Sequence, residues 1–282
     1  MNLTDIRDIK ALLARHGFYF SKSMGQNFLI ADWVPRQIAD AAGLDEHCAV
    51  LEIGPGIGPL TRQLAARAGR VAAVELDRAL LPILAETLAD CPNVEVISGD
   101  VMKLDLEELT GQRFNGFPVK ACANLPYNIT TPVITKLLEA GCFQSITLMI
   151  QREVARRICA APGTSDCGAF SLFCQYRAQC ELLFEVPPEC FLPAPKVTSA
   201  VVRLTPRAVP PVAGSPDDIF AVVKAAFAQR RKTLLNGLSA AYGSRFSKDQ
   251  LRQIISDCGL PENVRGEQLG LEQFSALAKA LR

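Results

Sequence analysis

The first residues of the chain have the hydrophobic spacing of an α-helix. Apolar side chains recur three positions apart from residue 3 to residue 12, and Gly17 offers a natural end to the helix. Residues 21–29 (SKSMGQNFL) are too irregular to predict a regular element. A second helix is predicted over residues 32–43, with Pro35 in its first turn, where proline is well tolerated.

From residue 49 onward, short apolar runs alternate with helix-like stretches. Repeated alternation of this kind predicts a parallel sheet with helices on both faces. The five runs that we predict as strands are residues 49–53, 70–76, 94–98, 119–123 and 145–150. Two further strands, near 180–186 and 198–204, follow each other without a helix between them, so we expect them to be antiparallel. The sequence therefore predicts an α/β protein with a mostly parallel, seven-stranded sheet.

The chain divides into two predicted domains. Residues 206–216 hold four prolines and one glycine and are typical of a linker. We expect one domain over residues 1–205 and a small all-α domain over residues 217–282, which show only helical periodicity. Residues 206–282 hold 11 Lys and Arg against 7 Asp and Glu, a net +4, whereas the rest of the chain is at −3. A basic tail module favours a polyanionic partner, although so few charges are equally compatible with ordinary solvated surface.

Composition excludes several classes of protein. With 49% hydrophobic and 21% charged residues, the chain can bury a core, so it is not dominated by disorder. We expect a cytoplasmic protein with no membrane partner, because no apolar run is long enough to span a bilayer and the charged amino terminus does not resemble a signal peptide. The ten cysteines form no CxxC pair, and the chain has only two histidines, so we expect no metal site and no Ser–His–Asp triad.

A glycine-rich turn follows the first predicted strand of the sheet. Gly54, Gly56 and Gly58 lie between that strand and the next helix, where glycine lets the backbone approach a ligand closely. Taken alone, this turn could merely close a strand onto a helix. Glu75 and Asp100 end the second and third strands, and the carboxyl ends of parallel strands line one crevice. An acidic side chain at the end of the second strand can accept hydrogen bonds from both ribose hydroxyls.

The fourth strand ends in Asn124, Leu125, Pro126 and Tyr127, a tetrapeptide suited to binding an aromatic amine. The side-chain oxygen of Asn124 can accept one N–H, and Pro126 restricts Leu125 so that its carbonyl can accept another. The ring of Tyr127 offers a face on which a base can stack. An ordinary polar turn is the alternative interpretation.

Two further features have both a functional and an ordinary interpretation. Phe191, between the last two strands, either forms a second wall against the target base or is a core residue under a proline-rich turn. The triplet of Arg230, Arg231 and Lys232 either contacts phosphate or is a solvated helix face.

Taken together, these motifs resemble the small-subunit ribosomal RNA adenine N6,N6-dimethyltransferase family, over nearly the whole chain. The matching segments are residues 22–29 (KSMGQNFL), 52–56 (EIGPG), 124–128 (NLPYN), 191–197 (FLPAPKV) with Ser199, and 227–234 (FAQRRKTL). The sheet layout is similar to that of class I methyltransferases, which use S-adenosylmethionine. The resemblance implies methyl transfer to the N6 amines of two adjacent adenosines in the 3′-terminal hairpin loop of small-subunit ribosomal RNA, with a role in ribosome biogenesis.

The resemblance also implies a role for individual residues. It implies a cofactor site made of Gln26, Asn27, Leu29, Gly54, Gly56, Glu75, Asp100 and Asn124. It implies a catalytic, adenine-binding site made of Asn124, Leu125, Pro126, Tyr127 and Phe191. RNA contacts are expected from Lys22, Lys196, Arg230, Arg231 and Lys232. The expected partner is small-subunit ribosomal RNA or the pre-30S subunit, and the expected state is a monomer.

Three other functions stay open on sequence grounds. A nicotinamide-dependent dehydrogenase shares the glycine-rich turn but gives the Asn-Leu-Pro-Tyr segment no role. A large-subunit ribosomal RNA methyltransferase has related motifs, and Leu125 together with residues 191–197 disfavours it. A ribosome-assembly factor that binds RNA, with methylation secondary, is the third.

Overall fold

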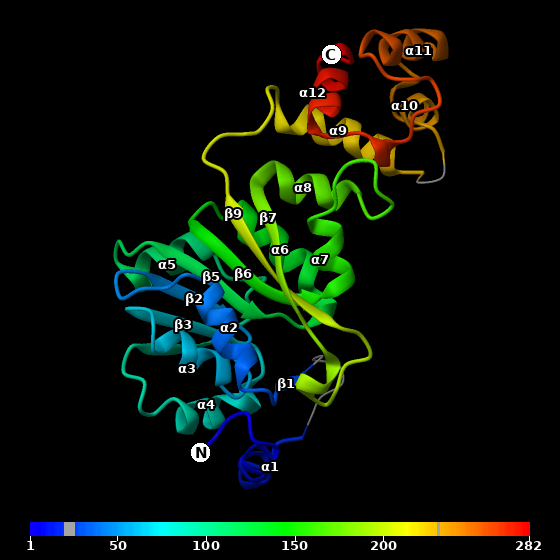
Figure 1. Ribbon diagram of the computed structural model, residues 1–282. Helices are drawn as coiled ribbons and strands as arrows, with labels where there is room; N and C mark the ends of the chain where they lie inside the picture. The colour runs from blue at the N-terminus through cyan, green and yellow to red at the C-terminus, as the bar shows by residue number, and fades with distance from the viewer. Residues whose placement is uncertain (20–25, 230–231) are drawn as a thin grey trace. The chain divides into compact units, whose positions relative to one another are not determined.

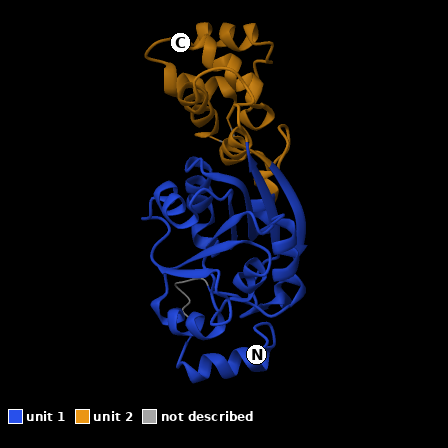
Figure 2. Cartoon of the chain, turned by 90° about the vertical axis from the view of Figure 1, so that its left-hand side faces the viewer, with its two compact units in different colours: residues 1–155, 180–206 blue, residues 156–179, 207–282 orange. Residues whose placement is uncertain are grey.

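The computed structural model describes residues 1–19, 26–229 and 232–282, so Lys22, Arg230 and Arg231 lie outside the described residues (Figure 1). The chain forms two compact units, coloured separately in Figure 2. Residues 1–155 and 180–206 make up the sheet unit, and residues 156–179 and 207–282 make up the helical unit.

Within the described residues, seven strands of the sheet unit form one mixed sheet. Its order is β4-β3-β2-β5-β6-β9-β7. The strands are β2 (Ala49–Ile53), β3 (Arg70–Glu75), β4 (Val94–Ser98), β5 (Val119–Asn124), β6 (Phe143–Gln151), β7 (Ala178–Val186) and β9 (Ser199–Pro206). Neighbouring strands in the series β4-β3-β2-β5-β6 are parallel to one another, and β9 runs antiparallel to β6. The predicted α/β fold with a mostly parallel, seven-stranded sheet is confirmed.

Both faces of the sheet are covered, because alternate residues of a strand point to opposite sides. On one face, Val34 and Ile38 of α2 pack in the same core cluster as Val50 of β2 and Met149 of β6. On the other face, Leu148 of β6 is fully buried. The helices of this unit are α1 (Ile6–Arg15), α2 (Trp33–Ala41), α3 (Pro59–Ala65), α4 (Leu81–Thr87), α5 (Leu106–Phe114) and α6 (Thr130–Glu139). Short 3₁₀ turns lie at Arg78–Leu80, Tyr127–Ile129 and Pro188–Cys190.

A second, two-stranded sheet joins two segments that are far apart in the sequence. Strand β1 (Phe28–Leu29) pairs antiparallel with β8 (Phe191–Leu192), so that Leu29 lies opposite Phe191. The expectation that residues 21–29 contain no regular element is therefore wrong for Phe28 and Leu29. A strand of two residues has no periodicity of its own, and long-range pairing alone creates it.

The helical unit has its own hydrophobic core. Val222, Leu238 and Phe274 are at most 1% exposed in it. Leu172 and Tyr176 of α8 belong to the same cluster, which explains why residues 156–179 group with the C-terminal helices and not with the sheet that precedes them. The helices are α8 (Ala169–Arg177), α9 (Pro216–Phe227), α10 (Leu234–Tyr242), α11 (Lys248–Asp257) and α12 (Leu271–Ala280), and α7 (Arg152–Ile158) runs across the boundary between the units. A 3₁₀ turn lies at Gly266–Gln268.

Candidate cofactor and adenine site

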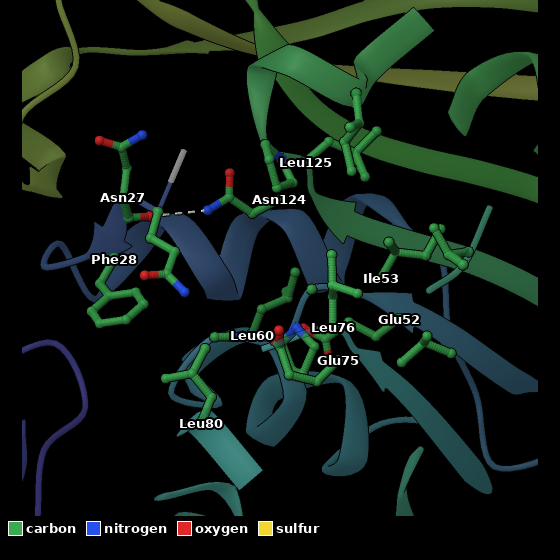
Figure 3. Close-up of a pocket in the computed structure, with 18 of the residues that line it drawn as sticks. Asn27, Phe28, Glu52, Ile53, Leu60, Glu75, Leu76, Leu80, Asn124 and Leu125 are labelled. Carbon is green, nitrogen blue, oxygen red and sulfur yellow. Dashed lines mark hydrogen bonds between the residues drawn. The ribbon is translucent and has the colours of Figure 1, made fainter. Parts of the chain in front are cut away.

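A cavity of about 250 Å³ opens where β2, β3, β4 and β5 end, at the carboxyl edge of the sheet (Figure 3). The structure brings together every residue expected in the cofactor and adenine sites. All of them line this cavity: Gln26, Asn27, Leu29, Gly54, Gly56, Glu75, Asp100, Asn124, Leu125, Pro126, Tyr127 and Phe191. The topology explains this convergence, because parallel neighbours in a sheet present their loops at the same edge.

The glycine-rich turn after β2 needs glycine because of its backbone conformation. Gly54 and Gly56 have φ angles of 67° and 61°, in the left-handed region that other residues rarely adopt. A Cβ atom at position 56 would lie 3.4 Å from the Phe28 ring, an ordinary van der Waals distance, so the backbone conformation and not steric overlap calls for glycine there. The turn thus brings bare backbone to the cavity wall, where a ligand can approach it.

Glu75 is fixed at the end of β3, with only 5% of its surface exposed. One carboxylate oxygen accepts a hydrogen bond from the backbone N–H of Asp77 at 2.8 Å, and the other accepts one from Gly56 at 3.4 Å. Burial raises the pKa of Glu75, and these two backbone donors oppose the rise. The carboxylate therefore has a defined orientation at the cavity wall, and each oxygen keeps a lone pair for a ligand hydroxyl.

Two other polar residues of the expected cofactor site, Gln26 and Asp100, have polar partners in the protein. The side chain of Gln26 donates to the Asp77 carboxylate at 2.7 Å, which ties the segment before β1 to the loop after β3. Asp100 accepts a hydrogen bond from the backbone N–H of Met102 at 3.0 Å. Its other carboxylate oxygen lies 4.0 Å from the Lys103 ammonium group.

Asn124 ends β5 with its side chain in the cavity. Its amide nitrogen donates to the backbone carbonyl of Asn27 at 3.5 Å (Figure 3). Since a carbonyl can only accept, this contact decides which end of the amide is nitrogen and leaves the Oδ1 atom as the outward acceptor. Among the described residues, none donates a hydrogen bond to that Oδ1 atom.

The backbone after Asn124 supplies a second acceptor. The N–H of Leu125 donates to Met149 of β6 at 3.1 Å, and the Leu125 side chain is only 1% exposed, so this residue is firmly held. The Pro126 carbonyl accepts from the Ile129 N–H and the Thr130 hydroxyl. By contrast, no donor from the described part of the chain reaches the Leu125 carbonyl.

The two expected aromatic walls are held differently. Tyr127 is partly exposed, and its hydroxyl lies 2.7 Å from the hydroxyl of Ser199 on β9. Burial raises the pKa of Tyr127, so its phenol is neutral at physiological pH. Phe191 is only 2% exposed and packs in the same core cluster as Leu29 while also lining the cavity. The wall and core interpretations of Phe191 are therefore compatible.

Sequence reasoning assigned no role to Glu52, which the structure places in the cavity wall. Glu52 is 1% exposed, and its Oε2 atom has no hydrogen-bond partner among the described residues. Burial raises the pKa of Glu52 to about 8, and the negative charge of Glu75 adds to the rise. The available signal was an acidic residue inside an otherwise apolar strand, next to the glycine-rich turn.

The residues expected to contact RNA are less completely placed. Lys196, between β8 and β9, is exposed, and so is Lys232, just before α10. Lys22, Arg230 and Arg231 lie outside the described residues. No group of three or more metal-binding side chains is found in residues 1–19, 26–229 and 232–282, and no helix there is long and apolar enough to cross a membrane.

Residues 17–281 match the family model for ribosomal RNA adenine dimethylase. The chain belongs to this family. It is 47% identical over 274 residues to ribosomal RNA small subunit methyltransferase A of Alkaliphilus oremlandii, which covers 96% of this chain and 95% of the relative. The protein of the same name from Geobacillus thermodenitrificans is 46% identical over 276 residues, with 96% and 94% covered.

Solved structures of similar enzymes share the fold. A dimethyladenosine transferase from Plasmodium falciparum superposes with a TM-score of 0.72 at 25% identity, over 88% of this chain and 95% of that one. The 23S rRNA methyltransferase ErmE gives a TM-score of 0.70 at 28% identity, over 90% and 99%. This protein is thus a class I methyltransferase in fold and a ribosomal RNA adenine dimethyltransferase by family.

The cavity of this adenine dimethyltransferase fits S-adenosylmethionine, the methyl donor of its family. The bare backbone at Gly56 permits close approach, and the two oriented oxygens of Glu75 suit the two hydroxyls of a ribose. The unpartnered Oε2 atom of Glu52 adds a buried polar atom to the wall of an otherwise mainly apolar cavity. The residues that would hold the donor are those already expected from the sequence, together with Glu52.

Proposed function

We propose that this protein transfers methyl groups from S-adenosylmethionine to the N6 amines of two adjacent adenosines in the 3′-terminal hairpin loop of small-subunit ribosomal RNA. The products are N6,N6-dimethyladenosines, made during small-subunit biogenesis. The choice of small-subunit RNA is supported by relatives at 46–47% identity over almost the whole chain, whose names specify the small subunit. The similarity to ErmE, a 23S rRNA methyltransferase, is lower at 28% identity.

The observation that carries this proposal is a pair of acceptors beside the glycine-rich turn. Asn124 Oδ1 and the Leu125 carbonyl belong to consecutive residues in the wall of a single cavity, which Gly56 and Glu75 also line. A primary aromatic amine offers two N–H groups and therefore matches two acceptors. Tyr127 and Phe191 line the same cavity and can enclose the flat ring.

The chemical task is to make a weak nucleophile attack. The lone pair of the adenine amine is delocalised into the ring. Hydrogen bonds to Asn124 Oδ1 and the Leu125 carbonyl favour a tetrahedral nitrogen, whose lone pair then points away from the ring. Bound S-adenosylmethionine supplies an electrophilic methyl group on its sulfonium. Holding both reactants in line can lower the barrier by several kcal/mol.

Proton removal needs no strong base in this site. Transfer of the methyl group to the neutral amine gives a positively charged ammonium on N6, and this cation is acidic enough to lose its extra proton to water. Accordingly, the residues that shape the amine site are acceptors and aromatic rings: Asn124, Leu125, Tyr127 and Phe191. Their role is to bind, orient and exclude water.

The target base must leave its stack to enter such a cavity, which requires less free energy in a loop than in a duplex. We assign RNA affinity to Lys22, Lys196, Arg230, Arg231 and Lys232, and to the basic helical domain over residues 217–282, with residues 1–205 as the catalytic domain and 206–216 as the linker. The substrate in this proposal is small-subunit ribosomal RNA or the pre-30S subunit, which the protein meets as a monomer in the cytoplasm.

Substrate choice tests the proposal. Undermodified small and large ribosomal subunits are incubated separately with the protein and methyl-labelled S-adenosylmethionine. Label should enter small-subunit RNA only. Preferential labelling of the large subunit would support the activity of the ErmE type instead and overturn the proposal.

A further inference from the structure

The hydroxyl at the tip of the Tyr127 side chain contacts a strand that lies far from Tyr127 in the sequence. Tyr127 follows β5 and begins a 3₁₀ turn, whereas its hydroxyl lies 2.7 Å from Ser199 Oγ at the start of β9. Tyr127 is the one hydrogen-bond partner of the Ser199 hydroxyl within the described residues. The ring is thus fixed at two points that lie 72 residues apart in the sequence.

Ser199 is itself in a rigid position. It is fully buried and lies opposite Gln151 in the antiparallel pair of β6 and β9. The preceding residue, Thr198, accepts a backbone hydrogen bond from Arg152 at 3.0 Å. Strand β6 also pairs with β5, where Met149 lies opposite Asn124. Two adjacent ladders that share β6 therefore connect Asn124 to Ser199, the residue that holds Tyr127.

The connection from β8 to β9 serves both walls of the adenine site. It starts at Phe191, which is buried by packing, and ends at Ser199. Phe191 needs no polar anchor, because only 2% of its surface is exposed. Tyr127 is partly exposed and would otherwise keep rotamer freedom that binding of a base must remove.

We infer that Ser199 is a positioning residue for the adenine site, which fixes the ring of Tyr127 through the hydroxyl–hydroxyl contact so that the target base meets a preformed stacking face. The catalytic role of Ser199 rests on the proposed adenine methylation. The contact between the Ser199 and Tyr127 hydroxyls is independent of that proposal.

A double-mutant cycle tests the inference. Ser199→Ala should lower kcat/KM for RNA by about 3- to 10-fold, the effect of one neutral hydrogen bond. Tyr127→Phe should cause a similar loss, and the double variant should be no worse than either single one. The inference fails if Ser199→Ala leaves kcat/KM unchanged. It also fails if Ser199→Ala lowers kcat/KM by the same factor in the Tyr127→Phe background as in the wild type, because Ser199 then does not act through the Tyr127 hydroxyl.

A matched control separates positioning from general stability. Thr147 of β6 is also fully buried, and its hydroxyl has no hydrogen-bond partner in the described part of the chain. Thr147→Val should leave kcat/KM unchanged, and S-adenosylmethionine affinity should be the same in all variants. A loss equal to that of Ser199→Ala would mean that any buried hydroxyl in this sheet matters equally, which contradicts a specific role.

A spectroscopic measurement tests the contact without activity. The chain has four tyrosines, so the protein labelled with 3-fluorotyrosine gives four ¹⁹F resonances, and Tyr127→Phe identifies one of them. Ser199→Ala should shift or broaden that resonance alone. An unchanged Tyr127 resonance would overturn the inference. If the wild type transferred no methyl group while this resonance responded as expected, the proposed function would fail and the contact would stand.

Discussion

The side-chain nitrogen of Asn124 lies 3.5 Å from the backbone carbonyl oxygen of Asn27, in a segment almost a hundred residues earlier in the sequence. This contact orients the Asn124 amide and leaves its oxygen as an acceptor to which none of the described residues donates. Asn27 directly precedes β1, whose pairing with β8 also places Phe191. The segment around β1 therefore links Asn124, the proposed acceptor for the amine, to Phe191, a proposed wall of the adenine site.

Removal of the Asn124 amide should abolish most of the catalysis. We expect Asn124→Ala to lower kcat by ~100-fold or more, as removal of one preorganised polar group does in other enzymes. RNA affinity should change little, because phosphate contacts lie elsewhere. Single-turnover methylation and RNA binding are measured on the same preparation. Near-native turnover would remove Asn124 from the mechanism.

Asn124→Asp separates two roles of the Asn124 side chain: accepting a hydrogen bond from the substrate amine, and being oriented by the contact with Asn27. Aspartate keeps an acceptor but cannot donate to Asn27, so its carboxylate faces a carbonyl oxygen without a hydrogen. We expect an activity between those of Asn124→Ala and the wild type in the same assay. If it equals the wild type, the contact with Asn27 is dispensable.

Glu75 should determine the affinity for the methyl donor. Removal of a charged hydrogen-bond acceptor costs roughly 1.5–3 kcal/mol. Glu75→Ala should therefore weaken binding of S-adenosylmethionine by about 10- to 150-fold in calorimetric titration. Glu108→Ala, an exposed substitution on α5, is the control and should bind normally. Equal affinities for the two variants would exclude Glu75 from the cofactor site.

Much of the cofactor site could be predicted because its signals are local. Each strand carries its own apolar run, and Gly54, Glu75 and Asp100 each lie within two residues of the end of such a strand. The topology then brings them together. The pairing of Leu29 with Phe191 and the contact of Tyr127 with Ser199 have no local signal, since each joins segments more than 70 residues apart. Residues 156–179 likewise reveal their grouping with the C-terminal helices only through tertiary packing.

Glu52 should make stability depend on pH. Its pKa rises from an ordinary value of 4.5 to about 8 in the folded protein, so between these values the folded state holds more protons than the unfolded state. The free energy of unfolding therefore decreases as pH rises through this window. Glutamine has nearly the same shape and no charge. Glu52→Gln should raise the melting temperature more at pH 8 than at pH 5, and a difference that does not vary with pH would contradict a protonated Glu52.

The basic triplet should supply RNA affinity without affecting the cofactor. Each side chain that binds a phosphate should contribute about 0.7–0.9 to the salt slope of RNA binding. Replacing Arg230, Arg231 and Lys232 with alanine should therefore flatten the slope by about two units if all three bind phosphate. A control triple variant carries alanine at Arg245, Lys248 and Lys279, which are exposed in the same unit. Parallel salt dependences for the wild type and the first triple variant would show that the triplet is a solvated surface.

In the proposed mechanism, Asn124 and its neighbours hold the N6 amine of adenine for methyl transfer. The most direct measurement is mass-spectrometric mapping of nucleosides in undermodified small subunits after incubation with labelled S-adenosylmethionine and either the wild type or Asn124→Ala. We expect labelled N6,N6-dimethyladenosine at two adjacent positions near the 3′ end of the RNA with the wild type, and almost none with the variant. Label on another base, or equal product from the two proteins, would contradict the proposed mechanism.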